Sequence, residues 1–312
     1  MWYREESPQL DVFSMLSHEQ AVTQAVKGIN KLSKVIDWEL FRDELESVLG
    51  YAQRDWSKGG RPPFDPVLMF KVLVLQKFHG LSDEECEFQV KDRFSFMKFL
   101  ELHPGDAIPD ARTIWDFKQA LERDGRNGAG RLFERFDQIL TDGGMIGRKG
   151  SIVDASFVDA PRQRNRRKEN ETHYGYKNHA KVDAESKLVT KYETTGANVH
   201  DSQVFDKLVD KNDEAVLADS AYLSEEAREH LLKCNCQDFI QLKGYRNHPL
   251  SEEDKKTNKG TSRIRARVEH VFGRMSQMAM DRLRTIGKER AHHHNGLSNL
   301  VYNMDRFAFL MR

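Results

Sequence analysis

The chain has 312 residues, of which 31% are charged, with 49 basic and 49 acidic side chains. This length is sufficient for two domains with hydrophobic cores of their own. The first residues do not resemble a signal peptide, and no apolar run is long enough to span a membrane. Three cysteines, Cys86, Cys234 and Cys236, are too few for a disulfide scaffold. We therefore expect a cytoplasmic protein without a membrane partner.

Charge is distributed almost evenly along the chain. Residues 1–150 carry 21 basic and 25 acidic side chains, a net charge of −4, whereas residues 151–312 carry 28 and 24, a net charge of +4. This asymmetry is too small to establish nucleic-acid binding. Only local clusters of cations can therefore indicate such a function.

The N-terminal half has the periodicity of helices. Apolar positions recur at helical spacing between residues 18 and 54, with Asp37 as a possible N-cap. Glycines and prolines at residues 59–66 interrupt the pattern, and an apolar helix is expected after them. Ser82 and Asp110 are N-cap candidates for two further helices. The pattern predicts an all-α domain and leaves open whether it contains a helix-turn-helix or is a bundle without a groove-reading helix.

Glycines at residues 143–150 mark a boundary, after which the pattern changes. Strands are predicted at residues 151–157, 173–183, 188–195, 215–218 and 238–242, and helices at residues 201–210, 224–233 and 263–280. The polar run at residues 251–262 is expected to be a mobile loop. This order of elements indicates a mixed α/β domain. We therefore divide the chain into a helical domain at residues 1–145 and an α/β domain at residues 146–312.

Two of the predicted strands contain a short apolar run that ends in an aspartate. Asp154 follows the β-branched residues Ile152 and Val153, and Asp219 closes the apolar run at residues 215–218. A capping or turn role would explain either aspartate alone. Together with Glu269, from the last predicted helix, they form the set that a two-metal phosphoryl-transfer site needs. Hard divalent cations prefer carboxylate oxygens, and a metal pair stabilises both oxygens of an in-line displacement.

Glu269 lies at the rim of an apolar helix face. At about 100° per residue, Glu269 and Arg265 lie just beyond the edge of this face, one turn apart. The face itself consists of Ile264, Val268, Val271, Phe272 and Met275. An acid at this rim could reach the strand ends. The alternative is an Arg–Glu pair at the surface, and the helix alone does not decide between the two.

Five cations crowd into the seven residues 162–168, soon after Asp154. They are Arg162, Arg164, Arg166, Arg167 and Lys168. Lys177 follows them among the aromatic residues Tyr174 and Tyr176. Such interleaving is typical of phosphate neutralisation and base stacking, although a solvated charged loop has a similar composition. The run of histidines at residues 292–294 has no acids at ligand spacing, so we interpret it as a surface or phosphate contact, not a metal site.

Short motifs along the chain match those of a known family. They are Gly60-Arg61-Pro62-Pro63, Leu81-Ser82-Asp83, Pro109-Asp110-Ala111-Arg112-Thr113-Ile114, Val153-Asp154-Ala155-Ser156, Tyr174-Gly175-Tyr176-Lys177, Asn198-Val199-His200-Asp201-Ser202, Ala218-Asp219-Ser220-Ala221-Tyr222, Arg265-Ala266-Arg267-Val268-Glu269 and Leu300-Val301-Tyr302-Asn303. Through them nearly the whole chain resembles bacterial insertion-sequence transposases of the DDE, ribonuclease-H-like class, most of all the insertion-sequence-five group. The signature of related proteins has Tyr and Lys where this chain has Ser262 and Ser276.

The resemblance implies a fold and a site. The fold is α/β, a ribonuclease-H-like catalytic domain with a mixed sheet and flanking helices, preceded by an all-α domain for DNA binding and dimerisation. Asp154, Asp219 and Glu269 would be the catalytic, metal-binding triad, holding two Mg²⁺ ions for which Mn²⁺ can substitute. Arg265, Lys177 and the cations at residues 162–168 would bind DNA.

The resemblance also implies partners and a reaction. The partners would be double-stranded DNA, as terminal inverted repeats and as target, and a second copy of the chain, at least when DNA is bound. The reaction would be DNA nicking and strand transfer in the bacterial cytoplasm, at the nucleoid. Two alternatives stay open: a transposase-derived DNA-binding protein that does not cleave, and a structure-selective nuclease of the same fold.

Overall fold

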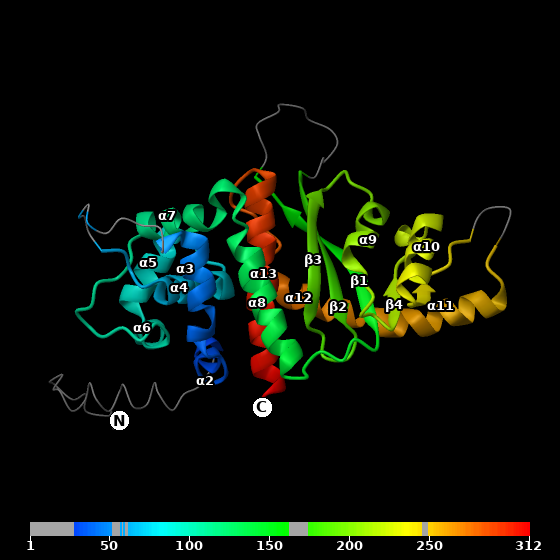
Figure 1. Cartoon of the computed structure of the whole chain (residues 1–312), viewed down its shortest axis with the longest axis horizontal. Coiled ribbons are helices and arrows are strands. Elements are labelled where there is room, and N and C mark those ends of the chain that lie inside the picture. Colours follow the sequence, from blue (N-terminus) through cyan, green and yellow to red (C-terminus); the bar gives the residue numbers. More distant parts are fainter. Residues whose placement is uncertain (1–27, 52–56, 58, 60–61, 162–173, 245–248) are drawn as a thin grey trace, which may run out of the picture.

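The protein is elongated, with a helical half and a sheet-containing half arranged along its longest axis (Figure 1). The computed structural model describes residues 28–51, 57, 59, 62–161, 174–244 and 249–312. Helices α8 (Gly128–Asp142) and α13 (Lys288–Leu310) cross the middle of the molecule, between the two halves. None of the helices in these residues combines the length and the hydrophobicity that a membrane span requires.

The described part of the N-terminal half consists of helices and turns, as predicted. The helices before α8 are η1 (Gly28–Lys31), α2 (Leu32–Val35), η2 (Trp38–Phe41), α3 (Arg42–Leu49), α4 (Pro66–His79), α5 (Asp83–Asp92), α6 (Phe94–Phe99), α7 (Ala111–Glu122) and η5 (Arg123–Gly125). The predicted caps are confirmed, because the side chains of Asp37, Ser82 and Asp110 each accept a backbone N–H at the start of η2, α5 and α7. Asp65 caps α4 in the same way.

The C-terminal half is built on a five-stranded mixed sheet. Its strands are β1 (Ser151–Asp159), β2 (Gly175–Asp183), β3 (Val189–Gly196), β4 (Ala215–Ala218) and β5 (Gln237–Ile240), in the order β3-β2-β1-β4-β5. The first three strands in sequence pair antiparallel, whereas β4 runs parallel to β1 and β5 parallel to β4. The predicted α/β class, with a mixed sheet and flanking helices, is confirmed.

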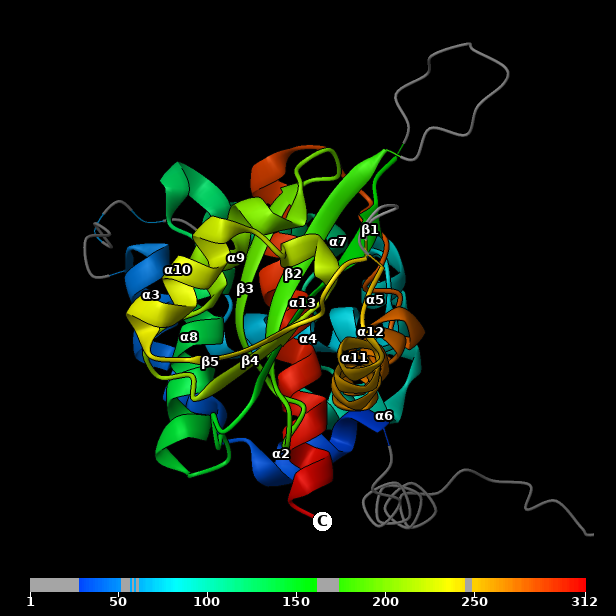
Figure 2. The same cartoon turned by 90° about the vertical axis from the view of Figure 1, so that its right-hand side faces the viewer.

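Helices cover both faces of the sheet (Figure 2). Side chains alternate along a strand, so the neighbours Ile152 and Val153 of β1 point to opposite faces. Ile152 belongs to the cluster that includes α13, whereas Val153 belongs to a smaller cluster with α9 (Phe205–Leu208) and α10 (Glu225–Cys234). The short helices η6 (Asp201–Val204) and η7 (Ser220–Tyr222) lie in the connections on either side of β4.

A row of buried asparagines fixes α13 on the sheet. Asn295, Asn299 and Asn303 are four residues apart, so they lie on one face of the helix. Asn295 donates to the hydroxyl of Thr194, and Asn299 exchanges two hydrogen bonds with the side-chain amide of Asn178. Asn303 bonds to both backbone groups of Val189, and all these distances lie between 2.7 and 3.1 Å. Because buried polar groups are costly unless hydrogen-bonded, these pairs define one position of the helix against β2 and β3.

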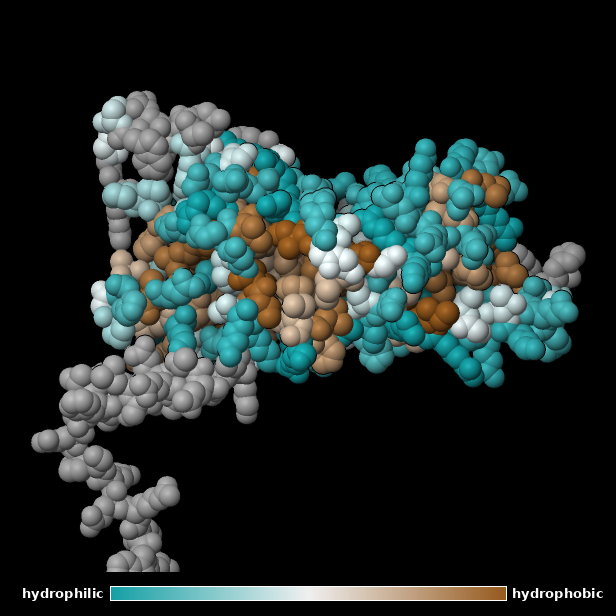
Figure 3. Space-filling view, turned by 60° about the horizontal axis from the view of Figure 1, so that its bottom comes forward, coloured by the Kyte–Doolittle hydropathy of each residue, from teal (hydrophilic) through white to brown (hydrophobic). Residues whose placement is uncertain are grey.

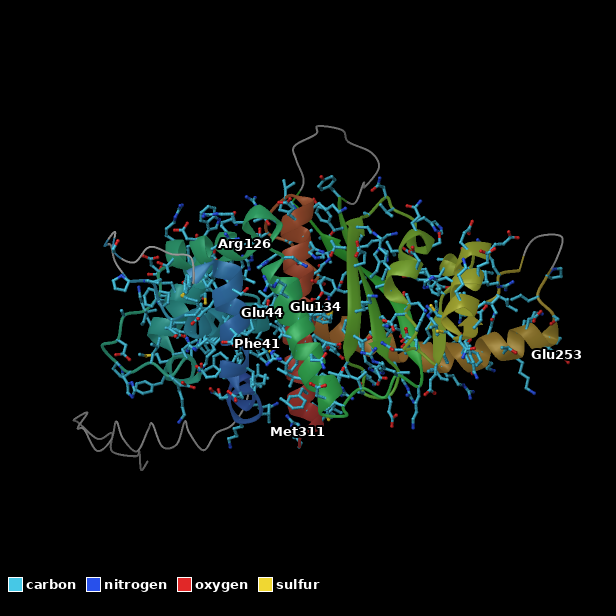
Figure 4. The ribbon with its side chains drawn as sticks, in the orientation of Figure 1. Phe41, Glu44, Arg126, Glu134, Glu253 and Met311 are labelled. Carbon is cyan, nitrogen blue, oxygen red and sulfur yellow. The ribbon has the colours of Figure 1, made fainter. Side chains whose placement is uncertain are left out.

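One hydrophobic core runs through both halves. It is continuous from Ile29 to Ala308. At its centre Phe136 of α8 contacts Phe41 on one side and Phe307 of α13 on the other, with ring centroids 6.1 and 6.0 Å apart. Phe41 and Glu44 lie against α8 (Figure 4). This core therefore crosses the proposed boundary at residues 145 and 146, and the division into two domains stays a proposal from the sequence.

The segment before the last predicted helix is not a loop. The predicted mobile loop at residues 251–262 is wrong, because α11 (Glu252–Arg265) forms there, with Glu253 at its far end (Figure 4). Ser251 and Asp254 make a capping box that begins it. The single predicted helix at residues 263–280 is also wrong, because it is interrupted at Ala266 and continues as α12 (Arg267–Gln277).

The two halves differ in their surface. Figure 3 shows apolar side chains gathered over the helical half and the middle of the molecule on this face, and mostly polar side chains over the sheet-containing half. Helix α11 has no buried residue. Its lack of an apolar stripe explains why its sequence reads as a loop, since apolar periodicity is the main signal for a helix.

Replacing Asn303 with Ala should lower the free energy of unfolding by about 2–4 kcal/mol, because the N–H and C=O of Val189 would lose their partner in a buried place. Urea denaturation of the wild type and the variant measures this loss. Asn212→Ala is the control, since Asn212 is exposed and its loss should change stability by no more than about 0.5 kcal/mol. Equal losses in the two variants would contradict a role of Asn303 in fixing α13.

Candidate active site

The two predicted aspartates are neighbours. Strands β1 and β4 run parallel with Val153 opposite Ala218. Asp154, the next residue within β1, therefore lies beside Asp219, which directly follows the end of β4; Asp154 itself is inside β1, not at its end. Each carboxylate accepts the backbone N–H of the residue that follows it at Oδ1, over 2.8 and 2.5 Å. These bonds leave the Oδ2 atoms available for a shared partner.

A guanidinium lies between the two carboxylates. Nη2 of Arg265 is 3.7 Å from Oδ2 of Asp154 and 3.7 Å from Oδ2 of Asp219, so the two oxygens are no more than twice that distance apart. Nη1 of Arg265 donates to Oε1 of Gln241 over 2.7 Å. Its Nε is buried and has no hydrogen-bond partner among the described residues. The site thus holds one positive group between two carboxylates and keeps one donor unused.

Asp154 lies in surroundings that disfavour its charge. Burial raises the pKa of its carboxyl, and the negative charges of Asp219 and Asp201 raise it further. The N–H of Ala155 and the guanidinium of Arg265 oppose this rise without cancelling it. A second cation beside Asp154 would favour the ionised carboxylate, because an opposite charge stabilises the charged form.

Glu269, the third predicted acid, does not join the two aspartates. It lies in the first turn of α12, four residues after Arg265, and its side chain is exposed. Within the described part of the chain its carboxylate makes no hydrogen bond or ion pair, and no three His, Cys, Asp or Glu side chains are grouped to hold a metal. The alternative pair of Arg265 with Glu269 does not form either, because Arg265 turns toward the aspartates.

A second polar cluster borders the site. Asp201 accepts a hydrogen bond from Nζ of Lys177 over 2.8 Å and lies 3.9 Å from Nδ1 of His179. His179 is buried and also contacts the hydroxyls of Thr195 (2.8 Å) and Tyr222 (3.5 Å). Burial lowers the pKa of His179 to about 4, so its ring is neutral at pH 7. Sequence reasoning did not assign roles to Asp201 and Tyr222, although both belong to the matched motifs.

The predicted DNA-binding cations are only partly described. Lys177 is engaged by Asp201 and by the carbonyl oxygen of Val199, 2.9 Å away, so it does not present an unpaired charge. Arg265 is engaged by the aspartates. The cluster at residues 162–168, with Arg162, Arg164, Arg166, Arg167 and Lys168, lies outside the described residues. Its role stays a prediction from the sequence.

The site is suited to a divalent cation. Two carboxylates that face one positive group supply the oxygen ligands that a hard cation prefers. In this structure the positive group between the carboxylates is the guanidinium of Arg265, and its Nε makes no hydrogen bond with the described residues. Glu269 is the nearest further acid along the chain that α12 could supply as a third ligand. The two aspartates therefore have the donor chemistry of a hard-cation site, whereas Glu269 does not lie with them among the described residues.

Asp154→Asn should raise thermal stability at pH 7. The pKa of Asp154 is higher in the folded state than in the unfolded state, so its protonated carboxyl stabilises the folded state at a pH below the unfolded pKa. This stabilisation is lost as the pH rises through the folded pKa. Ionised Asp154 therefore disfavours folding at pH 7, and the amide does not. The advantage of the variant should disappear toward pH 4. Thermal melts of both proteins at the two pH values test this, and a variant less stable at pH 7 would show that attraction to Arg265 outweighs burial.

Comparison with known proteins identifies the family. A family profile described as "Transposase DDE domain" matches residues 146–304, and a second, "Transposase domain (DUF772)", matches residues 17–120. Among solved structures, a chain titled "Crystal structure of a pre-cleavage Mos1 transpososome" is similar, at 10% sequence identity and a TM-score of 0.20, with 81% of this chain and 80% of that chain covered. Because the first profile spans more than half of its residues, this chain belongs to the family of transposases with a DDE domain.

Proposed function

We propose that the protein binds the terminal inverted repeats of a mobile DNA element, nicks the DNA at them and transfers the cut strand to target DNA. The observation that supports this most directly is the pair of neighbouring carboxylates, Asp154 and Asp219, that share one positive group in a chain of the DDE family. Two Mg²⁺ ions, or Mn²⁺ in their place, would be held by Asp154, Asp219 and Glu269.

The protein's own groups prepare this chemistry. Bound divalent ions would supply activation of the attacking oxygen and stabilisation of the leaving oxygen. The backbone N–H groups of Ala155 and Ser220 hold Asp154 and Asp219 by Oδ1, which keeps each Oδ2 directed to the common centre. Arg265, once released from the aspartates, would offer a fork of donors to a DNA phosphate, and its Nε has no other partner among the described residues.

Recognition of DNA would use the rest of the chain. Arg162, Arg164, Arg166, Arg167 and Lys168 would neutralise backbone phosphates, and Lys177 would join them on leaving Asp201. The helical domain at residues 1–145 would read the repeats and support a homodimer on DNA, and residues 146–312 would cut. This activity belongs in the bacterial cytoplasm, at the nucleoid.

Removing one metal-binding charge should abolish cleavage and spare binding. Asp154→Asn, Asp219→Asn and Glu269→Gln should each reduce Mg²⁺-dependent nicking of a repeat-bearing duplex by about 10³-fold or more, because several kcal/mol of transition-state stabilisation is lost. Double variants should be little worse than single ones, since the three groups act as a unit. Nicking gels and a mobility-shift assay on the same protein separate the two effects.

The matched control is Glu253→Gln, which changes an exposed acid at the far end of α11. It should nick and bind as the wild type does. Nicking that survives in Asp154→Asn would place the metal site elsewhere. A wild type that binds ends and never nicks with Mg²⁺ or Mn²⁺ would favour the DNA-binding protein without cleavage, and cutting of branched DNA without repeats would favour the structure-selective nuclease.

Replacing Arg164, Arg166 and Arg167 with Ala should weaken DNA binding and flatten its salt dependence. Each lost phosphate contact lowers the slope of log K against log salt by about one. Binding isotherms from about 50 to 200 mM salt measure this slope. Replacement of three exposed cations of the sheet-containing half, Lys207, Lys211 and Lys233, is the control for total charge. An unchanged slope in the triple variant would mean that the cluster is a solvated face.

A further inference from the structure

A cavity of about 250 Å³ lies where the helical half meets the start of α13, away from the aspartates. Its walls come from the end of α4, the start of α5, α7, residues 278–285 and the start of α13. The basic residues of the lining are Lys77, Lys118, Arg282, Arg284 and Arg290, and the acidic ones are Asp83, Glu84 and Glu122. The lining therefore carries an excess of positive charge.

Lys77 and His294 form a hydrogen-bonded pair in the wall of the cavity. Nε2 of His294 lies 2.8 Å from the carbonyl oxygen of Met280, and its Nδ1 lies 2.9 Å from Nζ of Lys77. Burial lowers the pKa of His294 well below its ordinary value, so the ring is neutral at pH 7. A carbonyl only accepts, so Nε2 carries the single ring proton and Nδ1 accepts from Lys77, which is the member of the pair that can carry a positive charge.

Lys77 has no acid partner among the described residues. The charged groups that act on it, Lys118 and Arg284, are both cations, and with burial as the larger cause they lower the pKa of Lys77 to about 7. Asp83, the acid at the start of α5, is paired with Lys118. A half-buried ammonium beside other cations is destabilising unless a negative group joins it. The missing component of this cluster is an anion.

His293 adds an unused hydrogen-bonding group to the same cavity. Its side chain is 8% exposed, so the interpretation of residues 292–294 as a surface contact is wrong for this residue. Neither ring nitrogen has a hydrogen-bond partner among the described residues, and Nδ1 stands 3.8 Å from Oε1 of Glu122. Burial lowers the pKa of His293 to about 3, so the neutral ring offers one N–H at pH 7. Buried polar groups are rarely left without a partner.

The arginines of the cavity are positioned by the sheet and by α4. The N–H of Leu283 donates to the carbonyl oxygen of Asp159, at the end of β1, over 2.7 Å. Nη2 of Arg284 donates to the carbonyl oxygen of Gly80 over 2.8 Å. The cavity therefore adjoins the end of β1, from which the chain continues into the cation-rich residues 162–168.

We propose that this cavity binds a phosphate group, held by the charges of Lys77 and Arg284 and by a hydrogen bond from His293. A phosphate brings the negative charge and the several acceptor oxygens that these donors lack. Free phosphate and a phosphodiester of bound DNA share this chemistry. The binding is independent of strand cleavage at Asp154, so either can be present without the other.

Inorganic phosphate is the probe. The melting temperature of the full chain should rise by about 2–3 °C at a phosphate concentration of roughly ten times Kd, relative to sodium chloride at the same ionic strength and pH 7. The ³¹P line of phosphate should broaden in the presence of the protein. Both effects should be lost in Lys77→Met and reduced in Arg284→Gln, which alters an exposed side chain. Lys71→Met is the matched control, since Lys71 is a buried lysine of the same helix, α4, but pairs with Glu101 outside the cavity.

The result that would overturn the proposal is an equal rise in phosphate and chloride, or a phosphate effect that Lys77→Met retains. The source of the phosphate is decided by adding a DNA duplex that carries the element's ends. Loss of the ³¹P broadening with DNA would assign the cavity to a backbone phosphate, and retained broadening to a free phosphate. Nicking is not the readout, so a protein that does not cut DNA leaves the outcome interpretable.

Discussion

The parallel pairing of β1 with β4 is the constraint on which the site depends. It places Asp154, inside β1, beside Asp219 at the end of β4, and a slip of one residue would separate them. A buried ion pair helps to hold this register. Asp213, just before β4, accepts from the hydroxyl of Ser151 on β1 (2.6 Å) and from Nζ of Lys181 on β2 (2.9 Å). Asp213 thus fixes the start of the strand that Asp219 follows.

Much of this arrangement follows from local signals in the sequence. Apolar runs of β-branched residues define the strands, and small polar residues define the helix caps, because each acts within a few residues. Helix α11 could not be predicted from such signals, because it has no buried residue and its start depends on a capping box. The ion pairs of Arg265 with two aspartates and the burial of His293 could not be predicted either, because both depend on packing between segments far apart in the chain.

Arg265 explains how two acids can face each other in this structure. Like charges at this spacing repel, and burial makes the ionisation of Asp154 harder still. The guanidinium offsets both effects by standing at 3.7 Å from each carboxylate. Because Ala266 interrupts the helix directly after it, Arg265 and Glu269 belong to separate helices and need not move together.

The continuous core has a consequence for how such proteins can diversify. Phe136 of α8 touches Phe41 before it in the chain and Phe307 far after it, so the two halves interlock through a helix at their border. Exchange of the N-terminal half between related mobile elements by recombination at this border would bring together α8 and α13 side chains that had not evolved against each other. Such hybrids would begin with packing defects in the centre of the molecule. DNA specificity in this lineage would then change by substitution within the helical half more readily than by shuffling of whole modules.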